Sequence, residues 1–267
     1  MPELPEVETI ARNLKPNLIG RTILSANLRW SRTLAAPSPK KFREQITGQK
    51  ILDVGRRAKY LIIKLASAHL LIHLRMSGDL LLRDSRGKPE KHDRLVIQLS
   101  GDRSLAFNDT RKFGRIWLTT EPNRIFDQLG PEPLSRDFTP QWLHGALRKK
   151  HRRLKPLLLD QSFVAGLGNI YTDESLNIAR LHPLRESSSL TLKQAEALHE
   201  AIRMVLNEGI RRNGASIDWV YRGGEFQNYF RVYDREGKPC PRCKTKIKRI
   251  TVGQRGTHFC PNCQRLK

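Results

Sequence analysis

The chain has 267 residues, enough for one large domain or two ordinary domains with hydrophobic cores of their own. Its 49 lysine and arginine residues exceed its 26 aspartate and glutamate residues, for a formal net charge of +23. This excess points to a polyanionic partner, with nucleic acid as the first candidate and a membrane surface as the second. We see neither the run of about 18 apolar residues that a spanning helix needs nor a signal peptide, and we expect a cytoplasmic protein.

The first part of the chain predicts one helix followed by strands. Apolar residues recur at helical spacing over residues 2–16, Pro5 suits the first turn, and Pro16 is expected to end the helix. From about residue 20 to 118 the pattern changes to short strands such as KYLIIKL, HLLIHL, RLVIQL and GRIWL, separated by turns. A series of this kind favours a sandwich or a barrel.

The second part predicts helices. Four prolines in about twenty residues mark a linker, after which QWLHGALRKK, KPLLLDQ, NIYTDESLNIA and LKQAEALHEAIRMVLNEGIRRN have helical periodicity. We therefore expect an N-terminal domain over residues 1–120, a linker over 121–138, a helical domain over 139–230 and a cysteine-containing segment over 231–267.

All four cysteines lie in the last 28 residues, as Cys240-x2-Cys243, sixteen residues, and Cys260-x2-Cys263. This spacing is typical of a zinc site. Four thiolates complete a tetrahedral shell, so we expect one structural Zn2+ rather than a catalytic one. Its binding would supply folding energy to a segment that has too little apolar surface for a core. Two disulfides are the alternative, which the clustering disfavours.

The residues between the two cysteine pairs, KTKIKRITVGQRGTHF, predict two strands with a turn near Gly253–Gly256. Arg255 would lie at the tip among several lysine and arginine residues. A basic hairpin held by zinc is a device for binding DNA. A charged hairpin that is merely solvated is the alternative, which the overall charge makes weaker.

The amino terminus, MPELPEVET, has two interpretations. Prolines and glutamates are common where helices begin, so the segment can be a simple helix start. The chemical interpretation starts from the usual removal of an initiator methionine before a small residue such as Pro2, which exposes a secondary amine. An α-amino group has a pKa near 8, so a useful fraction is neutral and able to form a Schiff base. Glu3 and Glu6 are near enough in sequence to move protons.

Several segments together resemble the formamidopyrimidine-DNA glycosylase family. They are PELPEVET, RRAKYL, HLRMSG, NDTRKFG, LLLDQ followed by GLGNIYTDE, and the terminal four-cysteine hairpin, in this order over nearly the whole chain. The resemblance implies an α+β multidomain fold. Its parts are an N-terminal antiparallel β-sandwich with an N-terminal helix, a C-terminal helical domain with a helix–two-turns–helix motif, and a zinc-binding β-hairpin.

The resemblance also implies a bifunctional DNA glycosylase/AP lyase of base excision repair. Such an enzyme removes oxidised purines, including 8-oxoguanine and formamidopyrimidines, through a Schiff base on its N-terminal proline, and then cleaves the strand by β,δ-elimination. On this basis Pro2 is the nucleophile, Glu3 the acid/base, Glu6 a support for the sugar or for water, and Lys59 a catalytic-site lysine near the phosphate. On sequence pattern alone, Lys59 is an ordinary basic residue at a strand border.

Further residues are implied to contact DNA. Extruding a base leaves a hole in the stack, and large side chains inserted there lower the cost. Core packing is the alternative for the apolar ones, a satisfied strand histidine for His73, a helix-start lysine for Lys155 and a helix cap for Asn169. The DNA-binding set is His73, Met76, Arg111, Phe113, Lys155, Asn169 and Arg255.

The match includes a loop and two departures. Residues 216–229 correspond to a loop that covers the flipped base. Ala58 and Asp234 stand where members of the family usually have glycine.

We expect a monomer in a bacterial cytoplasm, acting at the nucleoid on double-stranded DNA with oxidised bases or abasic sites, without a membrane. Within the enzyme class the alternative is the endonuclease VIII type, which prefers oxidised pyrimidines; PELPEVET and the set Met76, Arg111 and Phe113 disfavour it. The alternative from another class is a DNA-binding protein without catalysis, against which the retained Pro2, Glu3 and Lys59 argue.

Overall fold

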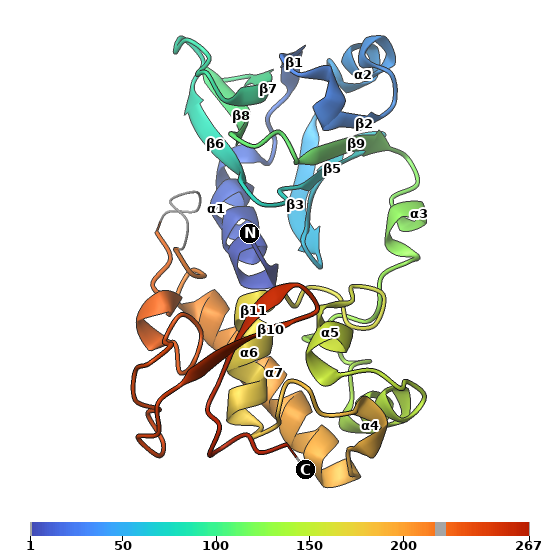
Figure 1. The fold of residues 1–267 in the computed structure, drawn as a ribbon. Helices are drawn as coiled ribbons and strands as arrows, with labels where there is room; N and C mark the ends of the chain where they lie inside the picture. Colours follow the sequence, from blue (N-terminus) through green and yellow to red (C-terminus); the bar gives the residue numbers. More distant parts are fainter. Residues whose placement is uncertain (1, 217–222, 267) are drawn as a thin grey trace. The chain divides into compact units, whose positions relative to one another are not determined.

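The computed structural model describes residues 2–216 and 223–266 (Figure 1). The chain divides into two compact units. Unit 1 extends to Asp127 and unit 2 begins at Gln128, with Ser216 and Gly224 grouped with unit 1. The helix, strand and cysteine segments predicted from the sequence are therefore distributed over two bodies.

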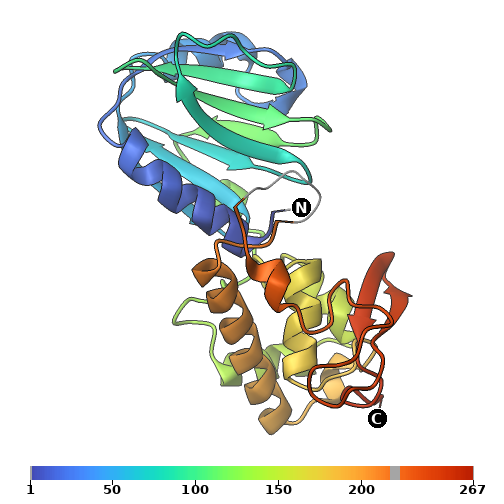
Figure 2. The same cartoon turned by 90° about the vertical axis from the view of Figure 1, so that its left-hand side faces the viewer.

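Unit 1 is a two-layer β-sandwich with helices at its edges (Figures 1 and 2). One sheet has the strand order β1-β7-β8-β6 and the other β2-β9-β5-β4-β3. Among the described strands of unit 1, paired neighbours are antiparallel except β2 and β9, which pair in parallel. The strands are β1 (Ile23–Leu28), β2 (Leu34–Ala36), β3 (Ile51–Arg57), β4 (Tyr60–Leu65), β5 (His69–His73), β6 (Gly78–Asp84), β7 (Asp93–Leu99), β8 (Arg103–Asp109) and β9 (Arg115–Thr119). This confirms the predicted sandwich.

The first helix, α1 (Leu4–Leu18), packs its apolar side against β3 and β4. The prediction that Pro16 ends this helix is wrong, because Pro16 lies inside the last turn. A proline there removes a single backbone donor, and the helix closes with Ile19 N–H donating to Lys15 O at 3.2 Å. Leu18 is fully buried, so core packing holds the turn that proline weakens.

A second helix, α2 (Pro39–Ile46), lies in the region expected to contain strands alone. Phe42 and Ile46, four residues apart, are both fully buried, and Pro39 occupies the first turn. Two apolar residues in eight give a weak periodic signal, which explains why the sequence did not predict the helix. Two short helices complete the unit, η1 (Ser31–Thr33) and α3 (Asn123–Phe126), the latter in the expected linker.

Unit 2 contains the predicted helices. Helix α7 begins with a capping box formed by Thr191 and Gln194. Helix α6 lies close to α7 at Gly209, where a Cβ atom would fall 2.5 Å from the Tyr171 ring, so glycine is needed for the approach. The ring of Tyr171 also stacks on Phe226. The helices are α4 (Pro140–Arg148), α5 (Leu154–Leu159), α6 (Asn169–Ile178), η2 (Ser187–Ser189), α7 (Leu192–Arg211) and η3 (Phe226–Tyr229).

The chain ends with the predicted hairpin, formed by β10 (Lys248–Val252) and β11 (Arg255–Phe259). Strand β11 lies against α6 (Figure 1). The residues around the hairpin include a small cluster of buried side chains, Val232, Cys240, Ile247 and Cys260. In the part of the chain that the structure describes, no helix combines the length and the apolar character needed to cross a bilayer.

Candidate active site and DNA-binding residues

The candidate nucleophile Pro2 directly precedes Glu3, the N-cap residue of α1, and it is buried. Glu3 caps this helix and Glu6 lies in its first turn; each side chain is only 2% exposed. They form a reciprocal capping box, in which Glu6 Oε2 accepts from the Glu3 amide at 2.7 Å and the Glu3 carboxylate accepts from the Glu6 amide. The structure therefore places two buried carboxylates one and four residues after Pro2.

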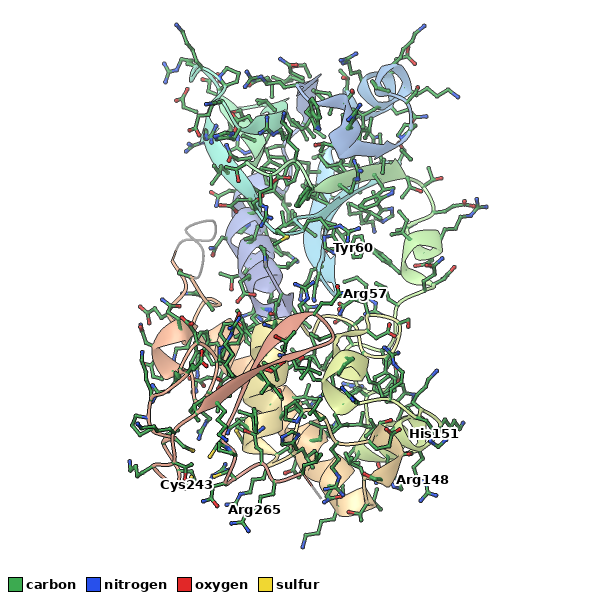
Figure 3. The ribbon with its side chains drawn as sticks, in the orientation of Figure 1. Arg57, Tyr60, Arg148, His151, Cys243 and Arg265 are labelled. Carbon is green, nitrogen blue, oxygen red and sulfur yellow. The ribbon has the colours of Figure 1, made fainter. Side chains whose placement is uncertain are left out.

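Lys59 lies in the tight turn between β3 and β4 and is 5% exposed. Ala58, beside it, has a φ of 52°, in the left-handed region that favours glycine. Arg57 and Tyr60 flank the turn and pair across the ladder (Figure 3). The sequence's departure from glycine at position 58 thus falls on a backbone position where glycine is the unstrained residue.

His73 ends β5 opposite Tyr60, whose ring meets it edge-on at 4.7 Å. Burial, with smaller effects from the charges of Arg75 and Lys59, lowers the pKa of His73 to about 3. Its Nδ1 accepts from the Arg75 amide at 3.0 Å, so the neutral ring carries its proton on Nε2. His73 is therefore a neutral hydrogen-bond donor.

Met76 and Phe113 lie in turns that follow β5 and β8, and they are exposed by 36% and 48%. Exposed large apolar side chains are weak candidates for core packing, the alternative that the sequence left open. The guanidinium of Arg111 lies 5.2 Å from the centre of the Phe113 ring. The three predicted void-filling residues are thus on two adjacent turns that join the two sheets, because one turn leads into β6, the other follows β8, and these strands are neighbours.

In unit 2, Lys155 is fully buried on α5. Its Nζ lies 2.6 Å from Asp173 Oδ1 and donates to the Gly256 carbonyl at 2.9 Å. The lysine that the family resemblance implied as a DNA contact is therefore directed into the protein, toward the hairpin. Asp173 also accepts from the His258 amide at 2.8 Å, which ties α6 to β11.

Asn169 is the first residue of α6, after the N-cap residue Gly168, so it is not itself the cap. Its side-chain amide donates to the same Gly256 carbonyl, at 3.1 Å. Arg255, the neighbour of Gly256, begins β11 at the turn and is exposed, as predicted. The structure brings these residues of unit 2 together around the hairpin turn.

The four cysteine Sγ atoms all lie within 4.8 Å of one another. The separations between the Cys243 and Cys260 sulfurs and between the Cys263 and Cys243 sulfurs are 3.4 Å, far above the length of about 2.05 Å of a disulfide bond. A tetrahedral Zn2+ with bonds of about 2.3 Å separates its sulfurs by about 3.8 Å, so the cluster fits this ion. Cys243 is labelled in Figure 3. The cysteine set is thus arranged for a closed, structural zinc site.

Sequence reasoning missed three buried acidic residues that organise the surroundings of these sites. Asp109 is fully buried beneath the turn that carries Arg111. Asp173 and Glu174 are adjacent in α6, and the Glu174 carboxylate accepts from three backbone amides at residues 231–233. Burial raises the pKa of Glu174, an effect that these amides oppose. For Asp173 and Glu174, two adjacent acidic residues in a helix of a strongly basic chain were the available signal.

Of the loop over residues 216–229, residues 217–222 lie outside the described residues, whereas Phe226–Tyr229 form η3.

Family models match this chain along nearly its whole length. Residues 1–116 match the formamidopyrimidine-DNA glycosylase N-terminal domain, residues 129–220 the formamidopyrimidine-DNA glycosylase H2TH domain, and residues 237–266 a zinc finger found in FPG and IleRS. The formamidopyrimidine-DNA glycosylase of Chloroflexus aggregans is 48% identical, covering 100% of this chain and 99% of its own length. The chain belongs to the formamidopyrimidine-DNA glycosylase family.

Other relatives agree. The formamidopyrimidine-DNA glycosylase of Pelotomaculum thermopropionicum is 44% identical over the full length of both chains. The crystal structure of the Lactococcus lactis enzyme with N7-benzyl-Fapy-dG DNA matches with a TM-score of 0.93 and 38% identity, covering 99% of this chain and 100% of that one. MutM bound to DNA with carbocyclic 8-oxo-G matches with the same TM-score and coverage, at 39% identity.

As a formamidopyrimidine-DNA glycosylase, the chain is a base-excision-repair enzyme with glycosylase and AP lyase activities. The match to the family's zinc finger also identifies the four-cysteine cluster as a zinc finger, in agreement with its geometry.

Proposed function

We propose that this chain excises oxidised purines, including 8-oxoguanine and formamidopyrimidines, from double-stranded DNA with the amine of Pro2, and then cleaves the strand by β,δ-elimination. The observation that carries the proposal is the placement of Glu3 and Glu6, both buried and joined in a capping box, directly after Pro2. Relatives bound to DNA with Fapy-dG, 8-oxo-G and an abasic site support the substrate class. Because the substrate is chromosomal DNA, the proposed site of action is the nucleoid in a bacterial cytoplasm. The proposed oligomeric state is a monomer.

The chemistry requires that Met1 be removed, because the nitrogen of Pro2 is otherwise an unreactive amide. The free amine attacks C1′ of the damaged nucleotide, and the bond from C1′ to the base breaks as the base leaves with its electron pair and takes up a proton in place of the one that the amine loses. Glu3 protonates the ring oxygen as the sugar opens, which leaves an iminium ion between Pro2 and C1′. Glu6 is committed through one oxygen to the Glu3 amide and holds the helix start in place.

The iminium ion then serves as the electron sink for strand cleavage. Loss of a proton from C2′ allows the bond from C3′ to its phosphate oxygen to break, and loss of a proton from C4′ then allows the bond from C5′ to its phosphate oxygen to break. Water finally hydrolyses the iminium ion and restores the amine. No step passes through the zinc ion, whose four cysteine ligands leave no open position.

The proposed DNA contacts follow from the family resemblance and from the charge and hydrogen-bonding groups of the residues. Lys59 and the neutral donor Nε2–H of His73 would bind backbone phosphate in unit 1. Asn169 and the exposed Arg255 would do so in unit 2. Met76, Arg111 and Phe113 would fill the space left by the extruded base, with Arg111 also bonded to the orphaned partner base. The burial of Lys155 supports an indirect part in binding, through the hairpin that carries Arg255.

Borohydride trapping tests the proposal. Protein whose amino terminus has been verified by mass spectrometry is mixed with a duplex containing 8-oxoguanine opposite cytosine. We expect a covalent protein–DNA band that requires borohydride, and an adduct that peptide mapping assigns to the peptide beginning at Pro2. Glu3→Gln should lose base excision, whereas Glu8→Gln, a matched change farther along α1, should retain it.

Three outcomes would contradict the proposal in different ways. Trapping on oxidised pyrimidines but not on 8-oxoguanine would favour the endonuclease VIII type of substrate. An adduct on an internal lysine would exclude Pro2 as the nucleophile. DNA binding without trapping on any of these substrates, with zinc-loaded and processed protein, would leave a binding protein without catalysis.

A further inference from the structure

The turn that carries Arg111 and Phe113 closes on one buried carboxylate. Asp109, the last residue of β8, is fully buried. Its Oδ1 accepts from the Arg111 amide at 3.1 Å and its Oδ2 from the Gly114 amide at 2.8 Å. The carboxylate therefore spans the turn and bonds to both of its ends.

The same carboxylate reaches the turn that carries Met76. The hydroxyl of Ser77, also buried, donates to Asp109 Oδ1 and accepts from the Arg111 amide at 3.1 Å. Gly78, the next residue, pairs directly with Asp109 in the β6–β8 ladder. Ser77 and Asp109 thus form one shared hydrogen-bonding centre for two turns that are more than 30 residues apart in sequence.

Packing beneath the turns leaves little room for either to move independently. A Cβ atom at Gly114 would fall 2.3 Å from the Phe107 ring, and one at Gly78 would fall 2.8 Å from the same ring. Each turn also contains a residue in the left-handed region, Arg75 with φ 56° and Lys112 with φ 61°. Such a backbone path persists where surrounding bonds determine it.

We propose that Ser77 and Asp109 are positioning residues that join the two turns into one rigid unit, so that Met76, Arg111 and Phe113 enter the DNA stack together. The proposal rests on the proposed function for the roles of those three side chains. Side chains held in place before binding lose less conformational entropy when they insert. An aspartate is required because both of its oxygens accept hydrogen bonds; an asparagine would direct an N–H group at another donor.

The test compares Ser77→Ala and Asp109→Asn with Ser104→Ala. Ser104 is a matched control, since it is buried on the same strand as Asp109 but its hydroxyl makes only a 3.4 Å contact with Asp84 O. Insertion is measured by the fluorescence of 2-aminopurine placed beside an uncleavable tetrahydrofuran site in a duplex, at saturating protein. We expect both variants to lose at least about half of the wild-type fluorescence increase, with Ser104→Ala unchanged.

Activity gives a second readout that separates positioning from folding. We expect excision of 8-oxoguanine from duplex DNA to fall about tenfold or more in both variants, as misplaced groups near a reaction centre cause. The preference for cytosine over adenine opposite the lesion should also fall, because it depends on Arg111. Trapping on a single-stranded abasic oligonucleotide, which has no stack to fill, should stay within about twofold of wild type.

Unchanged fluorescence in both variants would overturn the proposal. An equal loss of activity on duplex and single-stranded DNA, together with a lowered unfolding temperature, would also overturn it. That pattern would mean that Ser77 and Asp109 only stabilise the fold. If the wild-type protein traps no substrate, the proposed function fails. The fluorescence experiment still decides the positioning proposal in that case, because it uses a site that cannot be cleaved.

Discussion

At two positions where the family usually has glycine, this chain has another residue in a backbone conformation that favours glycine. Ala58 has φ 52° and Asp234 has φ 54°, so both occupy the left-handed region. An alanine loses about 1–2 kcal/mol there relative to its preferred conformations, whereas an aspartate tolerates this region because its short side chain can hydrogen-bond locally. The chain therefore carries mild strain at Ala58, beside Lys59.

Ala58 allows this strain to be measured. Ala58→Gly should change the free energy of unfolding by less than about 1 kcal/mol, because relief of the strain offsets the lost methyl burial and the added chain entropy. Ala58→Val should destabilise by more than about 2 kcal/mol, since β-branching is poorly compatible with positive φ. Urea unfolding measures both. At Ala35, which is exposed on β2, the valine variant should have a free energy of unfolding at least as high as that of the glycine variant. If the valine variant were also at least as stable as the glycine variant at position 58, the explanation would be contradicted.

Asp79 predicts a pH dependence of stability. Burial raises its pKa to about 6, against smaller lowering effects from the Leu80 amide and Arg83. The folded state thus holds this proton more tightly than the unfolded state. The stability contribution is fully present below the unfolded pKa of about 3.8, and it is lost as the pH rises through about 6.

The variant Asp79→Asn removes this dependence. Relative to the variant, wild-type protein should lose about 1–2 kcal/mol of unfolding free energy between pH 5 and pH 7.5, as denaturant curves at each pH would measure. The control is Asp102→Asn, at an exposed turn of the same sheet, whose free energy of unfolding should change with pH as that of the wild type does. If the free energy of unfolding of Asp79→Asn also changed with pH as that of the wild type does, the pH dependence could not be assigned to Asp79.

Residues with a local signature could be predicted from the sequence, and residues defined by distant partners could not. Pro2, Glu3 and the cysteines are recognisable because their neighbours in sequence are also their neighbours in space. Asp109 was part of a recognised segment, yet its bond to Ser77 depends on the pairing of β6 with β8. The burial of Lys155 likewise follows from the docking of the hairpin on α6.

At the scale of elements, the hairpin is held to α5 and α6 by polar contacts as well as by packing. Lys155 and Asp173 are both fully buried and lie 2.6 Å apart. Near the zinc cluster, the side chain of Gln264 bonds to Asn177 and to the Leu181 carbonyl, each at 2.9 Å. Long helices and the hairpin were predictable from periodicity and spacing, whereas this docking required the fold.

Removing one member of the buried pair should be costly. Lys155→Met leaves the Asp173 carboxylate buried without its cation and should lower the unfolding free energy of unit 2 by about 3–5 kcal/mol. Lys155→Met with Asp173→Asn should be less destabilised than the sum of the single variants, as a double-mutant cycle measures. Arg152→Met, which breaks the more exposed pair with Asp160, should cost no more than about 1 kcal/mol. Equal losses from the buried and exposed pairs would contradict this account.

At the scale of the whole molecule, the charge of +23 sets the response of DNA binding to salt. Each phosphate contact made by lysine or arginine releases counterions, so the logarithm of the binding constant falls linearly with that of the salt concentration. Arg255→Ala should reduce the slope by about 0.9 if the residue binds one phosphate. Arg86→Ala removes the same charge from an exposed side chain paired with Asp84, and it is the control. Identical slopes for the two variants would mean that charge alone, rather than a contact at Arg255, determines the effect.

The capping box at the start of α1 also limits the freedom of the proposed nucleophile. The Glu3 amide is fixed by its bond to Glu6, and the pyrrolidine ring prevents rotation about the bond between the nitrogen of Pro2 and its Cα atom. A single rotatable bond, between Cα and the carbonyl carbon of Pro2, therefore separates the amine from an anchored peptide group. A lysine side chain has four such bonds. The amine thus behaves as a reagent of high effective molarity, since most of the entropy of orienting it is already lost on folding.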